Sequence, residues 1–218
     1  MIRVIVADDQ AIVRAGFTVI VEAAGDIEVV GEAKDGYQAV EMARALRPDV
    51  VCMDIRMPGR DGIEATRLLS SDPGGHIPVL VVTTFDLDDY VFGALEAGAA
   101  GFLLKGADEE ALVDAIRSVA AGEGTLDQKI TRRVLTEFAG RRSSAPRSTD
   151  AVVETLTGRE VDILRLLCEG LSNQEIAARL FIEPSTVKYH LAGLLGKIGA
   201  RDRLQAVVWA FRNGLDGG

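Results

Sequence analysis

The fold of the first half of the chain follows from one segment, Val50-Val51-Cys52-Met53-Asp54-Ile55-Arg56-Met57-Pro58-Gly59-Arg60-Asp61-Gly62. Its first four residues form a short apolar run of the kind found in buried strands. An acid ends this run, and the Pro-Gly pair that follows is typical of a loop. We therefore expect a strand at residues 50–53 that places Asp54 at the edge of a sheet.

Strands and helices alternate on both sides of this segment through the first 120 residues. Short β-branched runs predict strands at 4–6, 28–30, 50–53, 79–83 and 102–104. Amphipathic stretches predict helices at 12–23, 38–46, 63–69, 88–97 and 109–121. Five such βα units predict an α/β domain, a doubly wound parallel sheet with sites at the carboxyl ends of its strands. The alternative is a dinucleotide-binding half, but no G-x-G-x-x-G motif follows the first strand.

Charged and polar residues stand at the ends of four of these strands. Asp8 and Asp9 end the first strand and Asp54 ends the third, so neighbouring strands would bring three carboxylates together. Such carboxylates raise each other's pKa unless a hard cation neutralises them, and Mg²⁺ is the expected cation. Thr83 ends the fourth strand and Lys105 follows the fifth. This combination suits a phosphoryl group on Asp54.

The same positions resemble the receiver domain of bacterial two-component response regulators. The resemblance covers about residues 1–120 and rests on Asp8-Asp9, Asp54, Met57-Pro58-Gly59, Asp61-Gly62, Thr83 and Gly101-Phe102-Leu103-Leu104-Lys105. It implies a flavodoxin-like (βα)5 fold in which Asp54 accepts a phosphoryl group from the phosphohistidine of a sensor kinase. It also implies a Mg²⁺ site made by Asp8, Asp9, Asp54 and the backbone carbonyl of Arg56. Thr83 and Lys105 would bind the phosphoryl oxygens, and Phe102 would act as a switch residue that turns inward.

Two flanking residues bear on the fate of the phosphoryl group. Arg56 lies two residues after Asp54, and Phe85 lies two residues after Thr83. Both side chains would crowd the path of an attacking water molecule, so we expect slow hydrolysis. An aspartyl phosphatase also uses an aspartate nucleophile with Mg²⁺ and a lysine, but it needs an acid at the position of Arg56. We therefore expect no enzyme activity.

The pattern changes after residue 121. Apolar residues at 126, 130, 134, 135 and 138 have the spacing of one more helix, and residues 140–149 are small, polar and basic like a flexible linker. Capping boxes then follow at Thr157/Glu160, Ser172/Glu175 and Asp202/Gln205, which predict a compact helical domain. We expect domains at 1–121 and 152–214, joined by a connecting helix and linker at 122–151.

The C-terminal domain has the spacing of a helix-turn-helix. A predicted helix at 173–180 is followed after three residues by one that begins at Pro184. Residues 156–160, 171–177 and 185–190 resemble the four-helix DNA-binding domain of the LuxR/NarL/FixJ type, which implies binding to double-stranded promoter DNA. The helical spacing leaves one face of the recognition helix exposed, and its predicted DNA contacts are Thr186, Lys188, Tyr189 and Ala192.

Charge is distributed unevenly along the chain. Residues 1–120 contain 10 basic and 21 acidic residues, whereas residues 151–218 contain 8 of each. A neutral domain binds DNA weakly as a single copy, so we expect a homodimer upon phosphorylation. The last helix is apolar on two faces, and its predicted dimer face consists of Leu204, Val207, Val208 and Phe211. The alternative is a helix that is fully buried within one copy.

Composition excludes several classes of protein. With 48% hydrophobic and 26% charged residues, the chain is globular rather than disordered. No apolar stretch reaches the roughly 18 residues of a membrane span and no signal-peptide pattern opens the chain, so we expect a cytoplasmic protein with no membrane partner. Two cysteines and two histidines in unlike segments exclude structural zinc.

These features together predict a transcription regulator controlled by phosphorylation. Its expected partners are a sensor histidine kinase, promoter DNA and a second copy of the chain, and RNA polymerase is a further candidate. The alternative is a receiver-like DNA-binding protein that acts constitutively or senses another ligand without phosphorylation.

Overall fold

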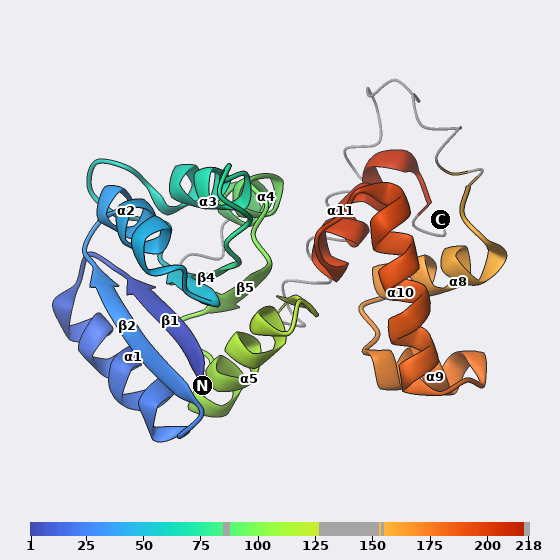
Figure 1. Ribbon diagram of the computed structural model, residues 1–218, viewed down its shortest axis with the longest axis horizontal. Coiled ribbons are helices and arrows are strands. Elements are labelled where there is room, and N and C mark those ends of the chain that lie inside the picture. The colour runs from blue at the N-terminus through green and yellow to red at the C-terminus, as the bar shows by residue number, and fades with distance from the viewer. Residues whose placement is uncertain (85–87, 127–152, 154, 216–218) are drawn as a thin grey trace. The chain divides into compact units, whose positions relative to one another are not determined.

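The computed structural model describes residues 1–84, 88–126, 153 and 155–215 of the chain (Figure 1). The chain divides into two compact units, Met1–Asp127 and Gln128–Gly218. The first unit alternates strands with helices, and the regular elements described in the second unit are helices. Most of the predicted connecting helix and linker lies outside the described residues.

All five predicted βα units are present in the first unit. The strands are β1 (Ile2–Ala7), β2 (Ile27–Ala33), β3 (Val50–Met53), β4 (Val79–Thr83), β5 (Gly101–Leu104) and β6 (Thr125–Leu126). The helices are α1 (Ala11–Ala23), α2 (Gly36–Leu46), α3 (Gly62–Ser70), α4 (Asp88–Glu96) and α5 (Glu109–Ala120). The placement of Leu126 in a helix is wrong, because Leu126 pairs with Phe102 and extends the sheet beyond the edge of β5.

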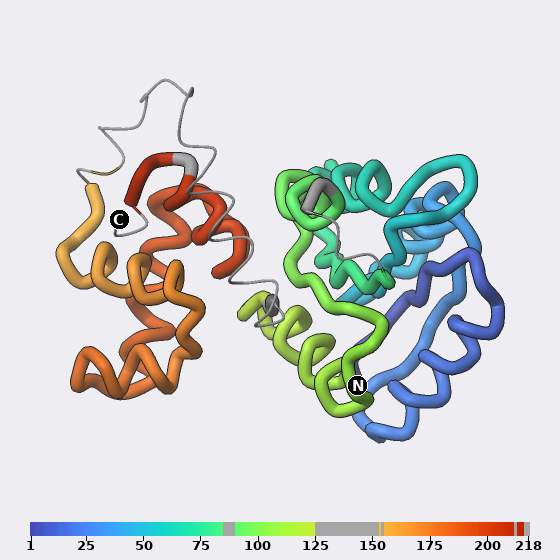
Figure 2. The backbone as a smooth tube through the Cα atoms, turned by 180° about the vertical axis from the view of Figure 1, so that it is seen from behind, coloured from blue at the N-terminus to red at the C-terminus, as the bar shows by residue number. Residues whose placement is uncertain are grey.

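The six strands form one parallel sheet in the order β2-β1-β3-β4-β5-β6. Helices α1 and α5 cover one face of the sheet, and α2, α3 and α4 cover the other, as the opposite views of Figures 1 and 2 show. Val4, Val6 and Cys52 pack in the core beneath α1 and α5. Because both faces are covered, the strands are apolar almost throughout, which explains their uninterrupted apolar runs in the sequence.

The second unit contains four described helices of more than one turn. They are α8 (Gly158–Cys168), α9 (Asn173–Leu180), α10 (Pro184–Ile198) and α11 (Arg203–Asn213). Their buried faces form one core that includes Ile163, Ile176, Val187, Leu194 and Ala206. Reciprocal capping boxes are present at Thr157/Glu160 and Ser172/Glu175, as predicted. At the start of α11, the Asp202 carboxylate accepts a bond of 2.9 Å from the backbone N–H of Gln205.

Asp202 is an unusual cap because it is only 3% exposed, and its Oδ2 has no hydrogen-bond partner among the residues that are described. Burial raises the pKa of its carboxyl from 3.8 to about 6. Because the pKa of Asp202 is higher in the folded unit than in the unfolded chain, protonation of Asp202 favours folding. This contribution to the stability of the second unit is complete below pH 3.8 and is lost as the pH rises through about 6.

We therefore expect Asp202→Asn to stabilise the second unit by about 1–2 kcal/mol at pH 7.5, because the amide keeps the cap without a buried charge. Fluorescence of Trp209, the single tryptophan, would follow denaturant unfolding of this unit. The gain should shrink as the pH is lowered from 6 toward 4, and Asp162→Asn at an exposed position of α8 should have little effect. An Asn variant no more stable than wild type at pH 7.5 would contradict this account of Asp202.

Candidate functional site

The sheet places the predicted acids next to one another. Strands β1 and β3 are neighbours with Ala7 opposite Met53, so the residues that follow, Asp8 and Asp54, lie side by side. The backbone N–H of Asp54 donates to the carbonyl of Ala7 at 2.8 Å. This position lies at the switch point of the sheet, where the strand order turns from β1 to β2 on one side and to β3 on the other. Ligand sites of doubly wound sheets lie at such points.

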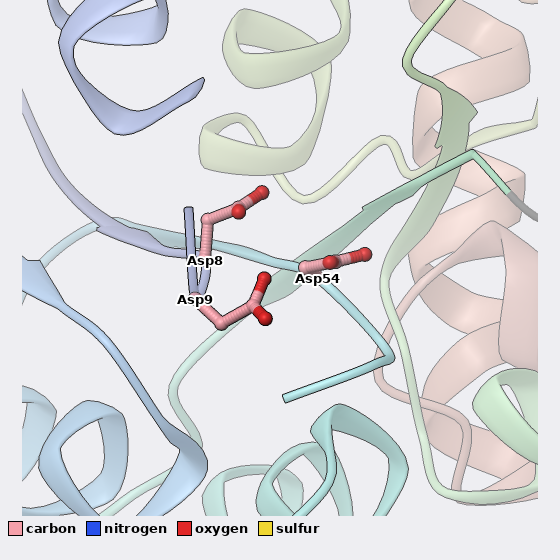
Figure 3. Close-up of side chains that lie close together, drawn as sticks. All are labelled: Asp8, Asp9 and Asp54. Carbon is pink, nitrogen blue, oxygen red and sulfur yellow. The ribbon is translucent and has the colours of Figure 1, made fainter. Parts of the chain in front are cut away.

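Three carboxylates gather at this edge. Oxygens of Asp8, Asp9 and Asp54 all lie within 4.8 Å of one another. Figure 3 shows the three side chains close together at the strand ends. Asp8 and Asp54 are 3% and 5% exposed, whereas Asp9 is exposed. The ammonium of Lys105 lies 2.5 Å from Asp8 Oδ2 and 3.1 Å from Asp54 Oδ2. One cation therefore bridges the two buried carboxylates.

Thr83 and Lys105 reach the same edge from the next two strands. Thr83 is the last residue of β4 and is fully buried. The backbone N–H of Lys105, which follows β5, donates to the carbonyl of Thr83 at 2.9 Å. The acids, the hydroxyl and the ammonium predicted from the sequence are thus brought to one edge of the sheet.

The environment shifts the pKa values of two of these groups. Burial raises the pKa of the Asp54 carboxyl, and the neighbouring Asp8 charge adds to the rise while Lys105 opposes it. Burial acts to lower the pKa of Lys105, but its bonds to Asp8 and Asp54 outweigh that effect, so the pKa is raised. Lys105 therefore stays charged, and Asp54 binds a proton or a cation more readily than an exposed carboxylate does.

The donor set fits a hard divalent cation. The three carboxylates outnumber the Lys105 ammonium, which contacts two of them, Asp8 and Asp54, so negative charge remains in excess at this edge. Carboxylate oxygens are the ligands that Mg²⁺ prefers. Arg56 lies two residues beyond Asp54 in the loop between β3 and α3, where its backbone carbonyl is a further candidate ligand.

Two supporting contacts were not predicted from the sequence. Arg14 on α1 donates to the backbone carbonyl of Asp8 at 2.8 Å and pairs with Glu32 at 3.0 Å, which ties the loop after β1 to the end of β2. Gly62 begins α3 so close to the β3 strand end that a Cβ would overlap the Asp54 carbonyl oxygen. No local pattern points to Arg14, because an arginine on an amphipathic helix is ordinarily solvated.

The second unit presents the predicted recognition face on α10. Val187, Leu191 and Leu194 are buried in the core, and the opposite side of the helix is exposed. On that side Lys188, Tyr189 and Ala192 are exposed, whereas Thr186 is half-buried. Glu183 makes no side-chain cap bond at the start of α10 with any residue that the structure describes.

An ion pair between a buried glutamate and an exposed lysine ties α8 to the recognition helix. Glu160 is 5% exposed, and its carboxylate lies 2.7 Å from the Lys197 ammonium near the end of α10. Burial opposes ionisation of Glu160, but the bonds from Lys197 and Thr157 outweigh it and lower the pKa. This ion pair therefore fixes the C-terminal end of α10 against α8. The exposed residues predicted to contact DNA lie near the other end of α10 and stay uncovered by the pair.

Known proteins match both units of the chain. The response regulator receiver domain matches residues 4–117, and the bacterial regulatory proteins of the luxR family match residues 154–210. The transcriptional regulatory protein LiaR of Bacillus subtilis is 44% identical in a match that covers 99% of this chain and 99% of LiaR.

The chain belongs to the LuxR family of response regulators.

Solved structures agree with this assignment. The crystal structure of the response regulator ChrA in a heme-sensing two-component system is 41% identical, and the match covers 98% of both chains with a TM-score of 0.53. The receiver domain of the putative response regulator NarL from Mycobacterium tuberculosis is 38% identical over 56% of this chain and 98% of its own, with a TM-score of 0.54.

This response regulator therefore combines a receiver domain with a LuxR-type DNA-binding domain, and it is a transcription regulator rather than an enzyme. The family resemblance seen in the sequence is confirmed. A sensor kinase and DNA are the partners that this combination of domains implies. In the ranges that the structure covers, every helix is too short or too polar to cross a membrane.

The response regulator does not offer its predicted dimer face as a free surface. The four residues Leu204, Val207, Val208 and Phe211 are between 2% and 9% exposed in a single chain. Val207 and Phe211 pack in the core of the helical unit. The four side chains are therefore covered within one copy and could pair two copies only after a rearrangement. The helix is not fully buried, because Gln205 and Trp209 are half-buried, so the alternative is not met either and the dimer face stays a prediction.

Two further predictions concern the residues around the acidic edge. Phe102, the expected switch residue, is fully buried. Its neighbour Leu103 belongs to the core beneath α1 and α5, so alternation along β5 directs Phe102 to the opposite face of the sheet. Phe85, the residue predicted to slow hydrolysis, lies outside the described residues, and its effect stays a prediction.

Proposed function

We propose that phosphorylation of Asp54 by a sensor histidine kinase switches this transcription regulator on. The proposal rests above all on the ammonium of Lys105, which contacts both Asp8 and Asp54 at the edge of the sheet. A lysine that holds two buried carboxylates in place is ready to exchange one of them for the oxygens of a phosphoryl group.

The transfer itself is a displacement at phosphorus. An oxygen of the ionised Asp54 carboxylate attacks the phosphorus while the bond to the kinase histidine breaks, and the electron pair of that bond stays with the imidazole nitrogen. The product is an acyl phosphate on Asp54. The backbone N–H of Ile55 donates to Asp54 Oδ1 at 2.9 Å and orients the nucleophile. Lys105 and the hydroxyl of Thr83 would bind the transferred oxygens.

The residues that would hold Mg²⁺ are Asp8, Asp9, Asp54 and the backbone carbonyl of Arg56. When bound, the ion supplies positive charge that offsets the repulsion between the phosphoryl oxygens and the carboxylates. Without it, the incoming phosphoryl group would meet three negative side chains and one ammonium.

The output is binding to promoter DNA by the α10 face of Thr186, Lys188, Tyr189 and Ala192. Phosphorylation would draw Thr83 toward the new group and change the packing of Phe102, which shifts an existing equilibrium toward a dimer. In this proposal the unphosphorylated receiver domain keeps the helical unit from DNA. Residues 1–120 carry 10 basic and 21 acidic residues, a net charge of −11 that repels DNA, so release of the helical unit upon phosphorylation favours DNA binding. RNA polymerase is the proposed next partner at the promoter.

Treatment with acetyl phosphate and Mg²⁺ tests this switch. We expect the sedimentation coefficient to rise to that of a dimer and the affinity for DNA to rise with it. Genomic fragments selected with the treated protein would serve as the DNA, because their half-site spacing also reports the geometry of the dimer. If treatment changed neither the sedimentation coefficient nor the DNA affinity, the proposal would be contradicted and a constitutive DNA-binding protein would be favoured.

A further inference from the structure

The start of α2 contacts the loop that follows the phosphoacceptor. Helices α2 and α3 lie side by side on one face of the sheet (Figure 1). The backbone N–H of Gly36, the first residue of α2, donates to the carbonyl of Arg60 at 3.2 Å. A Cβ on Gly36 would lie 2.5 Å from that oxygen, so only glycine allows this approach. The loop is thus held from a second element, and not only by its own strand and helix.

The next residue, Tyr37, covers the same loop. The guanidinium carbon of Arg60 lies 4.3 Å from the centre of the Tyr37 ring, which is the geometry of a cation–π contact. Arg60 also pairs with Glu64 of α3 at 3.1 Å, so its side chain is held from two sides. Tyr37 is 57% exposed and therefore adds little to the core. The contact of its ring with Arg60 links α2 to the loop.

The base of the loop is closed independently of α2. The backbone N–H of Gly62 donates to the carbonyl of Ile55 at 2.8 Å, and Asp61 caps α3. Residues 56–60 form the span between these points, and Arg56 lies within it. Arg60 is the last residue of this span, so its contacts with α2 hold the end of the loop that is farther from Asp54.

We propose that Gly36, Tyr37 and Arg60 form a loop clamp that sets the position of the Arg56 carbonyl and thereby the affinity of the acidic site for Mg²⁺. This inference rests on the proposed function, since it concerns the metal site assigned there. The clamp residues are positioning residues: their contacts are with the loop, and the ligands remain the carboxylates and the Arg56 carbonyl. Loosening the clamp should weaken Mg²⁺ binding while the fold persists.

Calorimetric titration of the full-length protein with Mg²⁺ tests the clamp, alongside the melting temperature of each variant. Tyr37→Ala should weaken Mg²⁺ binding by roughly threefold, the value of an exposed cation–π contact, and Tyr37→Phe should restore it because the ring remains. Gly36→Ala should weaken binding more, by about tenfold or greater, because its Cβ displaces the Arg60 carbonyl. Gly16→Ala, on α1 where a Cβ meets no atom within 4 Å, is the matched control.

The outcomes separate the clamp from the function it rests on. Weaker binding in a Tyr37→Ala protein that still unfolds cooperatively, with rescue by phenylalanine, supports the clamp even if Gly36→Ala fails to fold. Equal Mg²⁺ affinity in wild type and Tyr37→Ala overturns the clamp and leaves the proposed function intact. A wild-type protein that takes up no Mg²⁺ at millimolar concentration overturns the metal site and the clamp together.

Discussion

Asp54→Asn protein takes up no phosphate from radiolabelled acetyl phosphate, whereas the wild-type protein is labelled: this is the largest effect we expect. The amide of asparagine is not a nucleophile toward phosphorus, so the acyl phosphate cannot form. The substitution keeps the size of the side chain and an oxygen that can accept the bond from Ile55. Lys105 keeps Asp8 as its partner at 2.5 Å. The loss of labelling is therefore chemical and not a consequence of unfolding.

A matched carboxylate in the same loop provides the control. Asp61→Asn removes a charge at the exposed cap of α3, where asparagine caps equally well. This variant should be labelled like wild type. Equal labelling of Asp54→Asn and wild type would mean that another group accepts phosphate, and the assignment of Asp54 would fall.

The second large effect concerns DNA. Lys188→Ala should reduce the affinity of the phosphorylated protein for its selected DNA by roughly 10-fold or more for each DNA-binding domain, because removing a base contact costs about 1–3 kcal/mol. In a dimer both DNA-binding domains carry the substitution, so this free-energy cost applies twice. Lys188 is exposed on α10 while its neighbour Val187 is buried, so the fold should survive the substitution.

The salt dependence of binding identifies what Lys188 touches. If it binds a phosphate, the slope of log affinity against log salt concentration should fall by roughly 0.9 for each phosphate that is no longer neutralised, and all sequences should weaken alike. If it binds a base, discrimination between sequences should fall instead. Arg165→Ala, at an exposed position of α8, should change neither quantity strongly. An unaltered DNA affinity of Lys188→Ala would exclude Lys188 as a DNA contact of α10.

Much of the acidic site could be predicted from the sequence because each of its residues follows a strand. Strand ends are visible as boundaries of apolar runs, and parallel strands with helical crossovers place these ends at one edge. Asp8, Asp54 and Thr83 are predictable in this way. The contacts of Arg14 with Asp8 and of Gly36 with Arg60 are not, because they join elements whose separation depends on how the helices pack.

The last helix shows the opposite case. The apolar positions Leu204, Val207, Val208 and Phe211 predict a surface for a second copy, yet all four are buried in one chain. Periodicity reports that a side chain is covered, but it does not report what covers it. The dimer that we propose must therefore use another surface of α11, another element, or a rearranged form of the helical unit.

Local patterns were sufficient to establish the order of strands and helices, the family, and the residue types that carry the chemistry, because periodicity, caps and strand ends are properties of short segments. Three-dimensional packing was needed to establish which carboxylates share the Lys105 ammonium, why Gly36 and Gly62 admit no side chain, and that Asp202 is a buried cap. Those features depend on distances between segments far apart in the chain, and such distances are set by how whole elements pack rather than by any short stretch of residues.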